Sequence, residues 1–240
     1  MISVPHTAIV LAAGLGTRMR PLTDDCPKPL VEVRGKPLMD YTLDSLVSAG
    51  VERAIVNVHY LADQVEAHLK KRTDIQIVIS DERGEVLETG GAIAKVRDQL
   101  GNDPVLVCNT DAFWGEDTGA PIEQMAARFD PEEADVLLLL ADTQRSLGYH
   151  GAGDLLMMDT GQITLRGEAQ SAPWAFSGVR IIKPQLYDNV PVRKFSAKEI
   201  WKPLFNARRM YGLALDDFWL HVGDPKAVKD AEMWLMCHGR

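Results

Sequence analysis

Residues Ile9–Leu38 have the sequence IVLAAGLGTRMRPLTDDCPKPLVEVRGKPL, which combines an apolar run, a glycine turn and several basic residues. The run Ala8–Leu11 is short and rich in β-branched residues, which is typical of a buried strand. It stops at the small residues of Ala12–Thr17, where a backbone can approach a ligand closely. Turns of this kind can direct N–H groups at an anion, and Arg18 and Lys28 add positive charge nearby. This order predicts a polyphosphate site.

The glycine turn differs from the two common phosphate-binding glycine motifs. The Walker spacing with Gly-Lys-Ser/Thr is absent, and GLGTRM lacks the third glycine of a dinucleotide fingerprint. A dehydrogenase would also need a ribose-binding acid about twenty residues beyond the turn. Glu32 lies in that region, but between an expected strand and a turn rather than at the end of a second βα unit. A dehydrogenase is therefore disfavoured.

The whole pattern resembles the signature of the sugar-1-phosphate nucleotidyltransferases. The resemblance is carried by Gly14, Gly16, Thr17, Arg18, Pro21, Thr23, Pro27 and Lys28. It implies that a nucleoside triphosphate and a sugar 1-phosphate react to give an NDP-sugar and pyrophosphate. It also implies three groups of site residues: Leu11, Ala12, Ala13 and Gly14 at the base and ribose, Gly16, Thr17 and Arg18 at the triphosphate, and Lys28 at the α-phosphate. Arg18 and Lys28 are the catalytic residues that it implies.

Length and charge restrict the choice of partners. The 240 residues are most simply one domain, residues 1–240, without room for the C-terminal β-helix of larger bifunctional relatives. The net charge of −8 gives no electrostatic reason to expect nucleic acid or an anionic membrane as a partner. A local positive site on an acidic protein suits a small anionic substrate, and the sequence leaves the oligomeric state open.

The cysteines and the apolar runs indicate a cytoplasmic protein. Cys26, Cys108 and Cys237 have no Cys-x-x-Cys spacing, and three thiols cannot all pair. The apolar run Ile9–Ala13 is too short for a signal peptide or a membrane span. We therefore expect reduced thiols in the cytoplasm.

Strand and helix patterns alternate along the first part of the chain. Strands are expected at 8–11, 54–58, 75–80, 105–109, 134–140 and 176–182, and helices at 37–47, 63–71, 91–100, 121–128, 197–210 and 225–237. Pro203 must break or kink the helix at 197–210. The polar, glycine-rich stretch 143–174 indicates a small antiparallel excursion over the sugar site. The predicted fold is α/β, a doubly wound, mostly parallel, Rossmann-like sheet of the glycosyltransferase-A type.

A hard divalent cation is expected beside the phosphates, most simply Mg²⁺, with Mn²⁺ as an alternative. Asn109-Thr110-Asp111 follows an apolar strand and matches the Asn-x-Asp of the family. The resemblance places Asn109 beside the nucleotide and Asp111 on the metal. An Asx turn is the alternative role for such an Asp.

The second metal position departs from the family pattern, Trp-x-Asp-Val-Gly-Thr-Pro. Here Trp219–Pro225 reads WLHVGDP, so His221 occupies the position of the ligand and Asp224 that of the Thr. Imidazole suits Mn²⁺, Co²⁺ or Zn²⁺ better than Mg²⁺. His221 ligates directly, or Asp224 substitutes, or Asp111 and the phosphates hold the ion alone. Asp224 is also a candidate helix N-cap before Pro225.

Two further segments resemble bacterial N-acetylmuramate-1-phosphate uridylyltransferases. The segment ETGG, with Glu88 and Gly90, is placed at the base, and GAGD, with Asp154, at the sugar. Ser177 and Gly178 would line the sugar pocket. These segments favour UTP and N-acetylmuramate 1-phosphate as substrates. The alternatives are a mannose- or heptose-1-phosphate guanylyltransferase and a catalytically silent sugar-nucleotide sensor, for which the substitution at His221 is the best argument.

Overall fold

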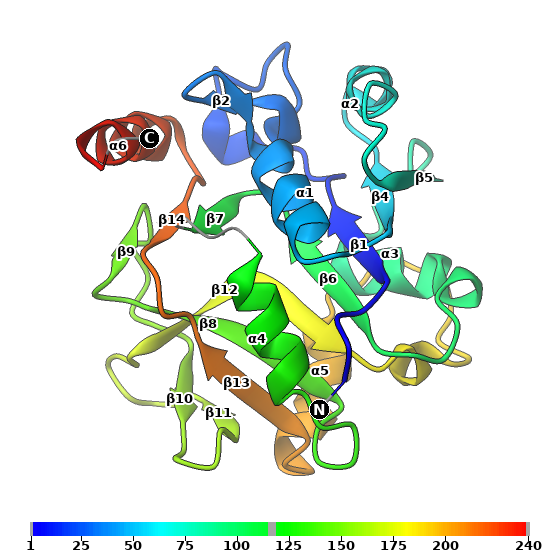
Figure 1. The fold of residues 1–240 in the computed structure, drawn as a ribbon, viewed down its shortest axis with the longest axis vertical. Helices are drawn as coiled ribbons and strands as arrows, with labels where there is room; N and C mark the ends of the chain where they lie inside the picture. Colours follow the sequence, from blue (N-terminus) through cyan, green and yellow to red (C-terminus); the bar gives the residue numbers. More distant parts are fainter. Residues whose placement is uncertain (1, 115–118, 239–240) are drawn as a thin grey trace.

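The computed structural model describes residues 2–114 and 119–238, and its centre is a nine-stranded mixed sheet with helices on both faces (Figure 1). Four strands run parallel in the order β6-β1-β4-β5. They are β1 (Thr7–Leu11), β4 (Arg53–Val58), β5 (Gln76–Asp81) and β6 (Val105–Asn109). Their carboxyl ends meet at one edge, where open α/β sheets bind ligands.

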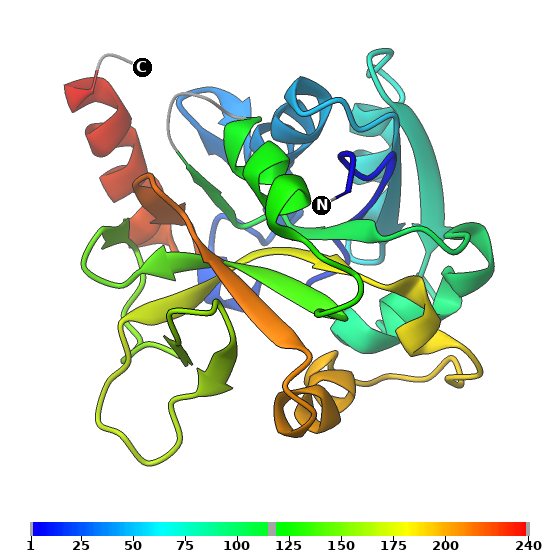
Figure 2. The same ribbon diagram turned by 60° about the horizontal axis from the view of Figure 1, so that its bottom comes forward.

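The second half of the sheet is largely antiparallel. The long strand β12 (Trp174–Ile182) runs antiparallel to both β6 and β8 (Val136–Asp142), as Figure 2 shows. Beyond β8 lies β13 (Met210–Ala214), parallel to it, and the hairpin of β10 (Leu155–Met157) and β11 (Ile163–Leu165) forms the edge next to β12. The predicted mixed α/β fold with an antiparallel excursion is confirmed.

Two helical layers bury the two faces of this sheet. Helices α1 (Leu38–Ser48), α2 (Ala62–Leu69) and α4 (Ala120–Arg128) share one apolar core with the sheet. Helices α3 (Glu88–Lys95) and α5 (Lys198–Asn206) share the core on the opposite face. Within the sheet, β1 alternates between the two cores, since Val10 belongs to the first and Ile9 to the second. This burial on both faces explains the continuous apolar run in the sequence.

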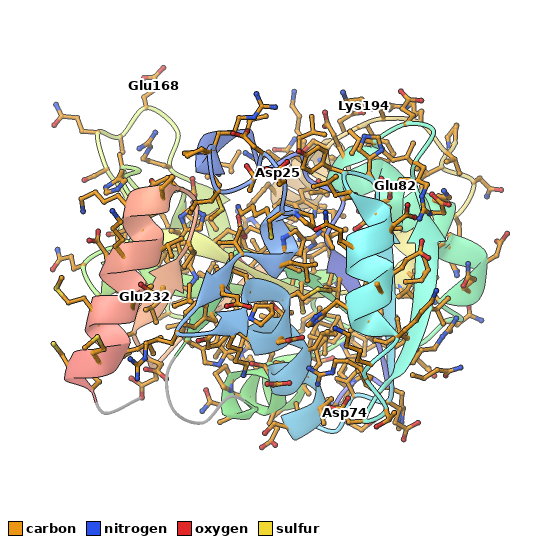
Figure 3. The ribbon with its side chains drawn as sticks, turned by 90° about the horizontal axis from the view of Figure 1, so that it is seen from above. Asp25, Asp74, Glu82, Glu168, Lys194 and Glu232 are labelled. Carbon is orange, nitrogen blue, oxygen red and sulfur yellow. The ribbon has the colours of Figure 1, made fainter. Side chains whose placement is uncertain are left out.

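A smaller unit packs against the end of the sheet. Its three-stranded sheet places β14 (Trp219–His221) between β7 (Ala112–Trp114) and β9 (Ser146–Leu147). The hairpin β2 (Glu32–Val33) and β3 (Lys36–Pro37) and the helix α6 (Pro225–Cys237) complete it. Figure 3 shows α6, with Glu232, and the end of β5, with Glu82, on opposite sides of the segment that carries Asp25. Four 3₁₀ helices lie between these elements: η1 (Thr17–Met19), η2 (Lys28–Leu30), η3 (Arg97–Gln99) and η4 (Pro184–Tyr187).

Two predicted helices differ from the structure by more than two residues at one end or at both. The helix predicted over 197–210 is wrong in its last part: α5 ends at Asn206, and β13 begins at Met210. Arg208 has a φ of 57°, a left-handed conformation that ends a helix but is usually taken by glycine, so the sequence carried no stop signal. The helix predicted over 91–100 begins earlier, at Glu88, and its last turn is the separate η3. Among the described residues, no helix combines the length and the apolar character needed to cross a bilayer.

Candidate functional site

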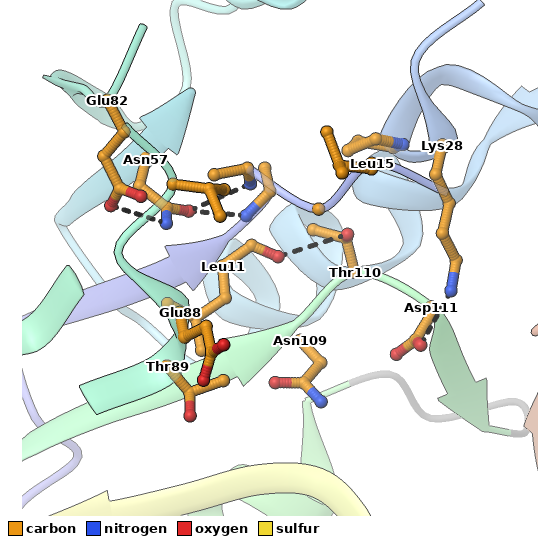
Figure 4. A pocket seen from close by; sticks show the side chains of 15 residues that line it. Leu11, Leu15, Lys28, Asn57, Glu82, Glu88, Thr89, Asn109, Thr110 and Asp111 are labelled. Carbon is orange, nitrogen blue, oxygen red and sulfur yellow. Dashed lines mark hydrogen bonds and ion pairs between the residues drawn. The ribbon is translucent and has the colours of Figure 1, made fainter. Parts of the chain in front are cut away.

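A pocket of about 270 Å³ opens where β1 and β6 end and where α3 begins (Figure 4). Its lining combines the apolar end of β1 with polar side chains from several elements. The lining residues are Leu11, Ala12, Ala13, Gly14, Leu15, Lys28, Pro29, Asn57, Glu82, Val86, Glu88, Thr89, Asn109, Thr110 and Asp111. Eight of the predicted site residues thus line this one pocket: Leu11, Ala12, Ala13, Gly14, Lys28, Glu88, Asn109 and Asp111.

The glycine turn is held from both ends. Gly16 has a φ of 63°, and a Cβ atom there would lie 3.0 Å from the side chains of both Lys28 and Thr23. The Thr23 hydroxyl donates to the Gly16 carbonyl over 2.8 Å. Glycine is therefore required by both conformation and space. Within the described part of the chain, the amides of Gly14 and Leu15 have no hydrogen-bond partner, so they are available to an anion.

Lys28 and Asp111 form an ion pair at one end of the pocket. The Nζ atom of Lys28 lies 2.8 Å from Oδ2 of Asp111, and their side chains are 14% and 21% exposed. Burial alone raises the pKa of Asp111, but the imidazole of His221 and the ammonium of Lys28 outweigh it and hold the pKa well below its usual range. Asp111 is therefore a carboxylate at neutral pH, which is the state that a metal requires.

A short antiparallel ladder brings His221 to Asp111. His221 pairs with Ala112 across β14 and β7, and the Val222 amide donates to the Asp111 carbonyl over 2.8 Å. His221 Nε2 lies 3.7 Å from Asp111 Oδ2. On the other side of the ring, Nδ1 lies 3.3 Å from the Gly148 carbonyl, which can only accept, so this contact is a hydrogen bond whenever Nδ1 carries a hydrogen, as it does in the imidazolium. Nε2 is then the nitrogen that faces the carboxylate.

The imidazole is held by aromatic packing. The ring of Trp219 stacks on His221 with the centroids 5.3 Å apart, and Tyr149 meets the same ring edge-on at 6.5 Å. Trp219 is buried. These contacts fix the direction of the imidazole before any ligand arrives.

The donors present fit a metal that is shared with substrate. Asp111 and His221 offer a carboxylate and an imidazole, and no group of three or more His, Cys, Asp or Glu side chains suited to a metal occurs in residues 2–114 and 119–238. Mg²⁺ is commonly held by one or two carboxylates plus substrate phosphates rather than by a complete protein cage. The residues therefore fit such an ion only together with a phosphate ligand.

Asp224 has a structural role. Its Oδ1 atom accepts the Ala227 amide over 2.9 Å, so it is the N-cap of α6, with Pro225 in the first turn. This is the capping alternative that the sequence offered. The arrangement uses one carboxylate oxygen of Asp224 in the helix cap. Of the two candidates for the second ligand, the structure places His221, the residue paired to β7, beside Asp111.

Arg18 belongs to the same end of the site. Both Arg18 and His221 lie next to Gly223. A Cβ atom added to Gly223 would be 3.6 Å from Arg18 Nη1 and 3.0 Å from His221 Cε1. The guanidinium is therefore close to the imidazole, although Arg18, Gly16 and Thr17 do not line the pocket itself. The structure groups Arg18 with His221 and Lys28 with Asp111.

The ETGG segment divides its residues between two roles. Glu88 lines the pocket and has a φ of 59°, a strained conformation for a residue with a side chain. Gly90 packs away from the pocket, since a Cβ there would lie 2.4 Å from the Phe195 ring. Its amide donates to the Phe195 carbonyl over 2.9 Å. Gly90 is thus needed for packing of the segment, whereas Glu88 and Thr89 face the ligand space.

The predicted sugar residues lie beside this pocket rather than in its wall. Gly178 has a φ of 101° and lies next to Asn109. A Cβ atom added to Gly178 would be 3.1 Å from the Cβ atom of Asn109. Asp154 accepts the Phe176 amide on Oδ2 over 3.3 Å and so ties the excursion to β12. Ser177 is buried, with 1% of its surface exposed. The structure therefore groups Asp154, Ser177 and Gly178 around β12, next to Asn109.

Two buried polar residues of the pocket were missed by the sequence analysis. Asn57 Oδ1 accepts the amides of Ala12 and Ala13 over 2.6 and 3.3 Å, and its Nδ2 donates to Glu82 over 2.9 Å. The signal available was a polar residue inside an apolar strand, because Asn57 interrupts the run AIVNV. A buried amide needs partners, which makes such a residue a candidate for positioning a loop.

Comparison with known proteins places the chain in a family. A nucleotidyl transferase family model matches residues 7–151. The chain is 49% identical to an N-acetylmuramate alpha-1-phosphate uridylyltransferase of Caulobacter vibrioides, over 97% of this chain and 98% of that protein. It is 32% identical to a mannose-1-phosphate guanylyltransferase catalytic subunit beta of Xenopus tropicalis, over 91% of this chain but 61% of that longer protein.

A solved structure shows the same fold. The inositol-1-phosphate CTP transferase from T. maritima superposes with a TM-score of 0.78 at 16% identity, over 97% of this chain and 96% of that one. At this identity the likeness concerns the fold alone. Together with the family match, these relationships show that the chain belongs to the nucleotidyl transferase family and is a sugar-1-phosphate nucleotidyltransferase.

Proposed function

We propose that the protein transfers UMP from UTP to N-acetylmuramate 1-phosphate, giving UDP-N-acetylmuramate and pyrophosphate. The observation that carries this proposal is the Lys28–Asp111 pair, with 2.8 Å between Nζ and Oδ2, next to the free amides of the glycine turn. This combination suits a triphosphate with a shared cation. The choice of base and sugar is supported by the name of the 49% identical Caulobacter vibrioides relative.

The reaction needs little covalent help from the protein. An oxygen of the sugar phosphate, already ionised at neutral pH, attacks the α-phosphorus of the nucleotide. The bond from that phosphorus to the bridging oxygen breaks, and the electron pair leaves with pyrophosphate. Alignment and charge neutralisation therefore account for the catalysis. Lys28 and Arg18 are proposed to supply positive charge at the α-phosphate and along the triphosphate.

A divalent cation, Mg²⁺ with Mn²⁺ as the alternative, is proposed to complete the site. When bound, it would neutralise charge that develops on the phosphate oxygens. Asp111 would hold it, with His221 as the second protein ligand, and Lys28 would then be free to turn from the carboxylate to the phosphate. An imidazole ligand favours Mn²⁺ over Mg²⁺ relative to a carboxylate in that place.

Two alternatives lead to different results in one assay. A guanylyltransferase for mannose or heptose 1-phosphate has support from the 32% identical Xenopus tropicalis relative. A silent sugar-nucleotide sensor has support from His221 in place of the family's carboxylate, but the Lys28–Asp111 ion pair lies in the same pocket as the glycine turn, as the proposed triphosphate site requires. The proposed enzyme uses Lys28 to neutralise the α-phosphate and Asp111 to hold the cation. A sensor that only binds a sugar nucleotide has no need for either function.

The test is pyrophosphate release from UTP, GTP, CTP and dTTP, each with the 1-phosphates of N-acetylmuramate, N-acetylglucosamine, glucose and mannose, in Mg²⁺ and in Mn²⁺. We expect the highest kcat/KM with UTP and N-acetylmuramate 1-phosphate. A preference for GTP and mannose 1-phosphate would replace the proposal with the guanylyltransferase. Nucleotide binding without turnover on any sugar would favour the sensor.

A further inference from the structure

Glu82 is buried directly after β5, with 2% of its surface exposed, and it uses both carboxylate oxygens inside the protein. Oε1 accepts the Asn57 side-chain amide over 2.9 Å, and Oε2 accepts the Leu87 amide over 3.0 Å. Its backbone is also held, because His59 Nδ1 lies 2.7 Å from the Glu82 carbonyl. A buried carboxylate is costly unless it is hydrogen-bonded in this way, so these contacts call for an explanation.

The contacts form one chain of hydrogen bonds across the pocket. The chain begins at the amides of Ala12 and Ala13, passes through Asn57 and Glu82, and ends at the Leu87 amide. Figure 4 shows the link between Asn57 and Glu82. One end is the glycine-turn wall, and the other is the residue directly before Glu88. We propose that Asn57 and Glu82 are positioning residues that fix the separation of these two walls and thereby set the affinity for the nucleotide. This inference rests on the proposed nucleotidyl transfer.

The hydrogen bonds at both ends restrict what the pocket offers to a ligand. Because the Ala12 and Ala13 amides already donate to Asn57, they are not available to a base or a phosphate. The amides of Gly14 and Leu15, which have no partner in the described part of the chain, remain. At the other end, the Leu87 amide donates the last hydrogen bond of the series to Glu82. The next residue, Glu88, has the strained φ of 59°. The Asn57–Glu82 link therefore holds both walls in their ligand-ready positions.

The direction of every bond in this chain is determined. The two ends are backbone donors, so each end needs an acceptor, and the link between Asn57 and Glu82 must join a donor to an acceptor. In Glu82→Gln, two donors face each other whichever way the amides are turned: either the two side-chain NH₂ groups meet, or one NH₂ group meets a backbone amide at one end. In Asn57→Asp, two carboxylates face each other. Each single change leaves one buried group unsatisfied, which weakens nucleotide binding by about 10- to 100-fold if the walls shift.

The double substitution Asn57→Asp with Glu82→Gln restores the chain with the link reversed. The Asp carboxylate accepts the Ala12 and Ala13 amides on one oxygen and the Gln NH₂ on the other, and the Gln carbonyl accepts the Leu87 amide. The net charge and the number of hydrogen bonds are those of the wild type. We expect the nucleotide Kd and KM of the double variant to return to within about threefold of the wild type, since additivity fails for residues in one network.

The experiment measures the Kd for UTP and GTP by calorimetry and the KM for nucleotide and for sugar 1-phosphate on the full chain. Ser80→Ala is the matched control, because Ser80 is buried in β5 two residues earlier and its hydroxyl has no partner among the described residues. We expect the single variants to raise the Kd and KM for nucleotide while the KM for sugar 1-phosphate changes less than threefold, and Ser80→Ala to change neither.

Three results would overturn the inference: single variants with unchanged nucleotide Kd, equal rises in both KM values, or a double variant no better than the singles. The Kd also separates this inference from the proposed function. If the wild type binds nucleotide but forms no product with N-acetylmuramate 1-phosphate, the proposed substrate is wrong and the positioning role is still decided by the Kd values. If the wild type binds no nucleotide, both are overturned.

Discussion

The Nζ atom of Lys28 lies 2.8 Å from Oδ2 of Asp111, and the two residues are 83 positions apart in the sequence. Lys28 begins the 3₁₀ helix η2, whereas Asp111 lies between β6 and β7. The pair therefore joins the segment that follows the glycine turn to the end of the central sheet. Positive and negative charge are held together at the point where the proposed function places the phosphates and the cation.

Asp111→Asn removes the negative charge at this point. We expect kcat to fall by about 10³-fold or more, because the amide is a poor ligand for a hard cation and leaves the phosphate charge without neutralisation. The far-ultraviolet circular dichroism spectrum should be unchanged. The control is Asp216→Asn, whose side chain is 91% exposed and lies 3.5 Å from Arg145 Nη1. Retained activity in Asp111→Asn would remove Asp111 from the metal site.

Lys28→Met removes the positive charge with little change in side-chain length. We expect kcat/KM to fall by about 10²- to 10³-fold, since one preorganised group at the developing charge of a transition state is worth that much. Lys28→Arg keeps the charge but changes its shape, and should recover part of the loss. Steady-state kinetics with saturating sugar 1-phosphate measures the effect. A variant with a normal kcat/KM would mean that Lys28 does not contact the α-phosphate.

The strand and helix pattern of the parallel half could be predicted from the sequence, because each element is long enough to show its own period. The strand expected over 105–109 coincides with β6, and the helix expected over 121–128 lies within α4. The strands β7, β9 and β14 have two or three residues, too few for any period, and they form only because their partners are in place. The strand β13 was hidden by a left-handed Arg208 where glycine would have been a recognisable stop.

At the site, too, residues placed by long elements could be predicted, whereas residues placed by short strands or by distant contacts could not. Asn109 and Asp111 follow a strand whose end could be predicted, so their place at the pocket could be expected. The approach of His221 depends on the short β7–β14 ladder, which no local pattern indicates. Asn57 interrupts an apolar strand, but its partners are the backbone amides of Ala12 and Ala13, which carry no sequence signal. Glu82 accepts the Leu87 amide five positions later, and no local pattern shows that it is buried against Asn57.

His221→Asp restores the carboxylate of the family pattern. We expect the variant to shift its metal preference towards Mg²⁺, because a carboxylate suits this hard cation better than imidazole does. The measurement is the ratio of kcat/KM in Mg²⁺ to that in Mn²⁺, titrated over metal concentration. Tyr149→Phe serves as the control, since it keeps an aromatic ring against His221 and leaves the candidate metal ligands Asp111 and His221 unchanged. An unchanged ratio in His221→Asp would argue that His221 is not a ligand.

Asp224→Ala tests the capping role. The variant loses the acceptor for the Ala227 amide at the start of α6, so we expect the free energy of unfolding to fall by about 1 kcal/mol. Asp224→Asn keeps an acceptor oxygen and should lose much less. Urea denaturation measures both. The metal concentration for half-maximal activity should stay the same in each variant, and a large rise in Asp224→Asn would instead assign Asp224 to the metal.

Asp135 gives the clearest dependence of stability on pH. Its Oδ1 atom lies 3.0 Å from Lys183 Nζ and 2.9 Å from Arg209 Nη2, and its side chain is 19% exposed. Burial raises the pKa of Asp135, but the hydrogen bonds from Arg209 and Lys183 outweigh it, and the pKa is lowered. A lowered pKa in the folded state stabilises the protein above the pKa of the unfolded chain, about 4, and this contribution is lost as the pH falls through the folded value.

Asp135→Asn should therefore be less stable than the wild type by about 1–3 kcal/mol at pH 7, because two cations lose a charged acceptor. Below pH 4 the difference should shrink, because the Asp135 carboxyl of the unfolded chain is protonated there first, and it should vanish as the pH falls through the lower pKa of the folded state. Urea denaturation at pH 7, 5 and 3 measures it, with the exposed Asp216→Asn as the control that should track the wild type throughout. A difference that stayed constant from pH 7 to pH 3 would show that packing of the Asp135 side chain, rather than its charge, stabilises this end of β8.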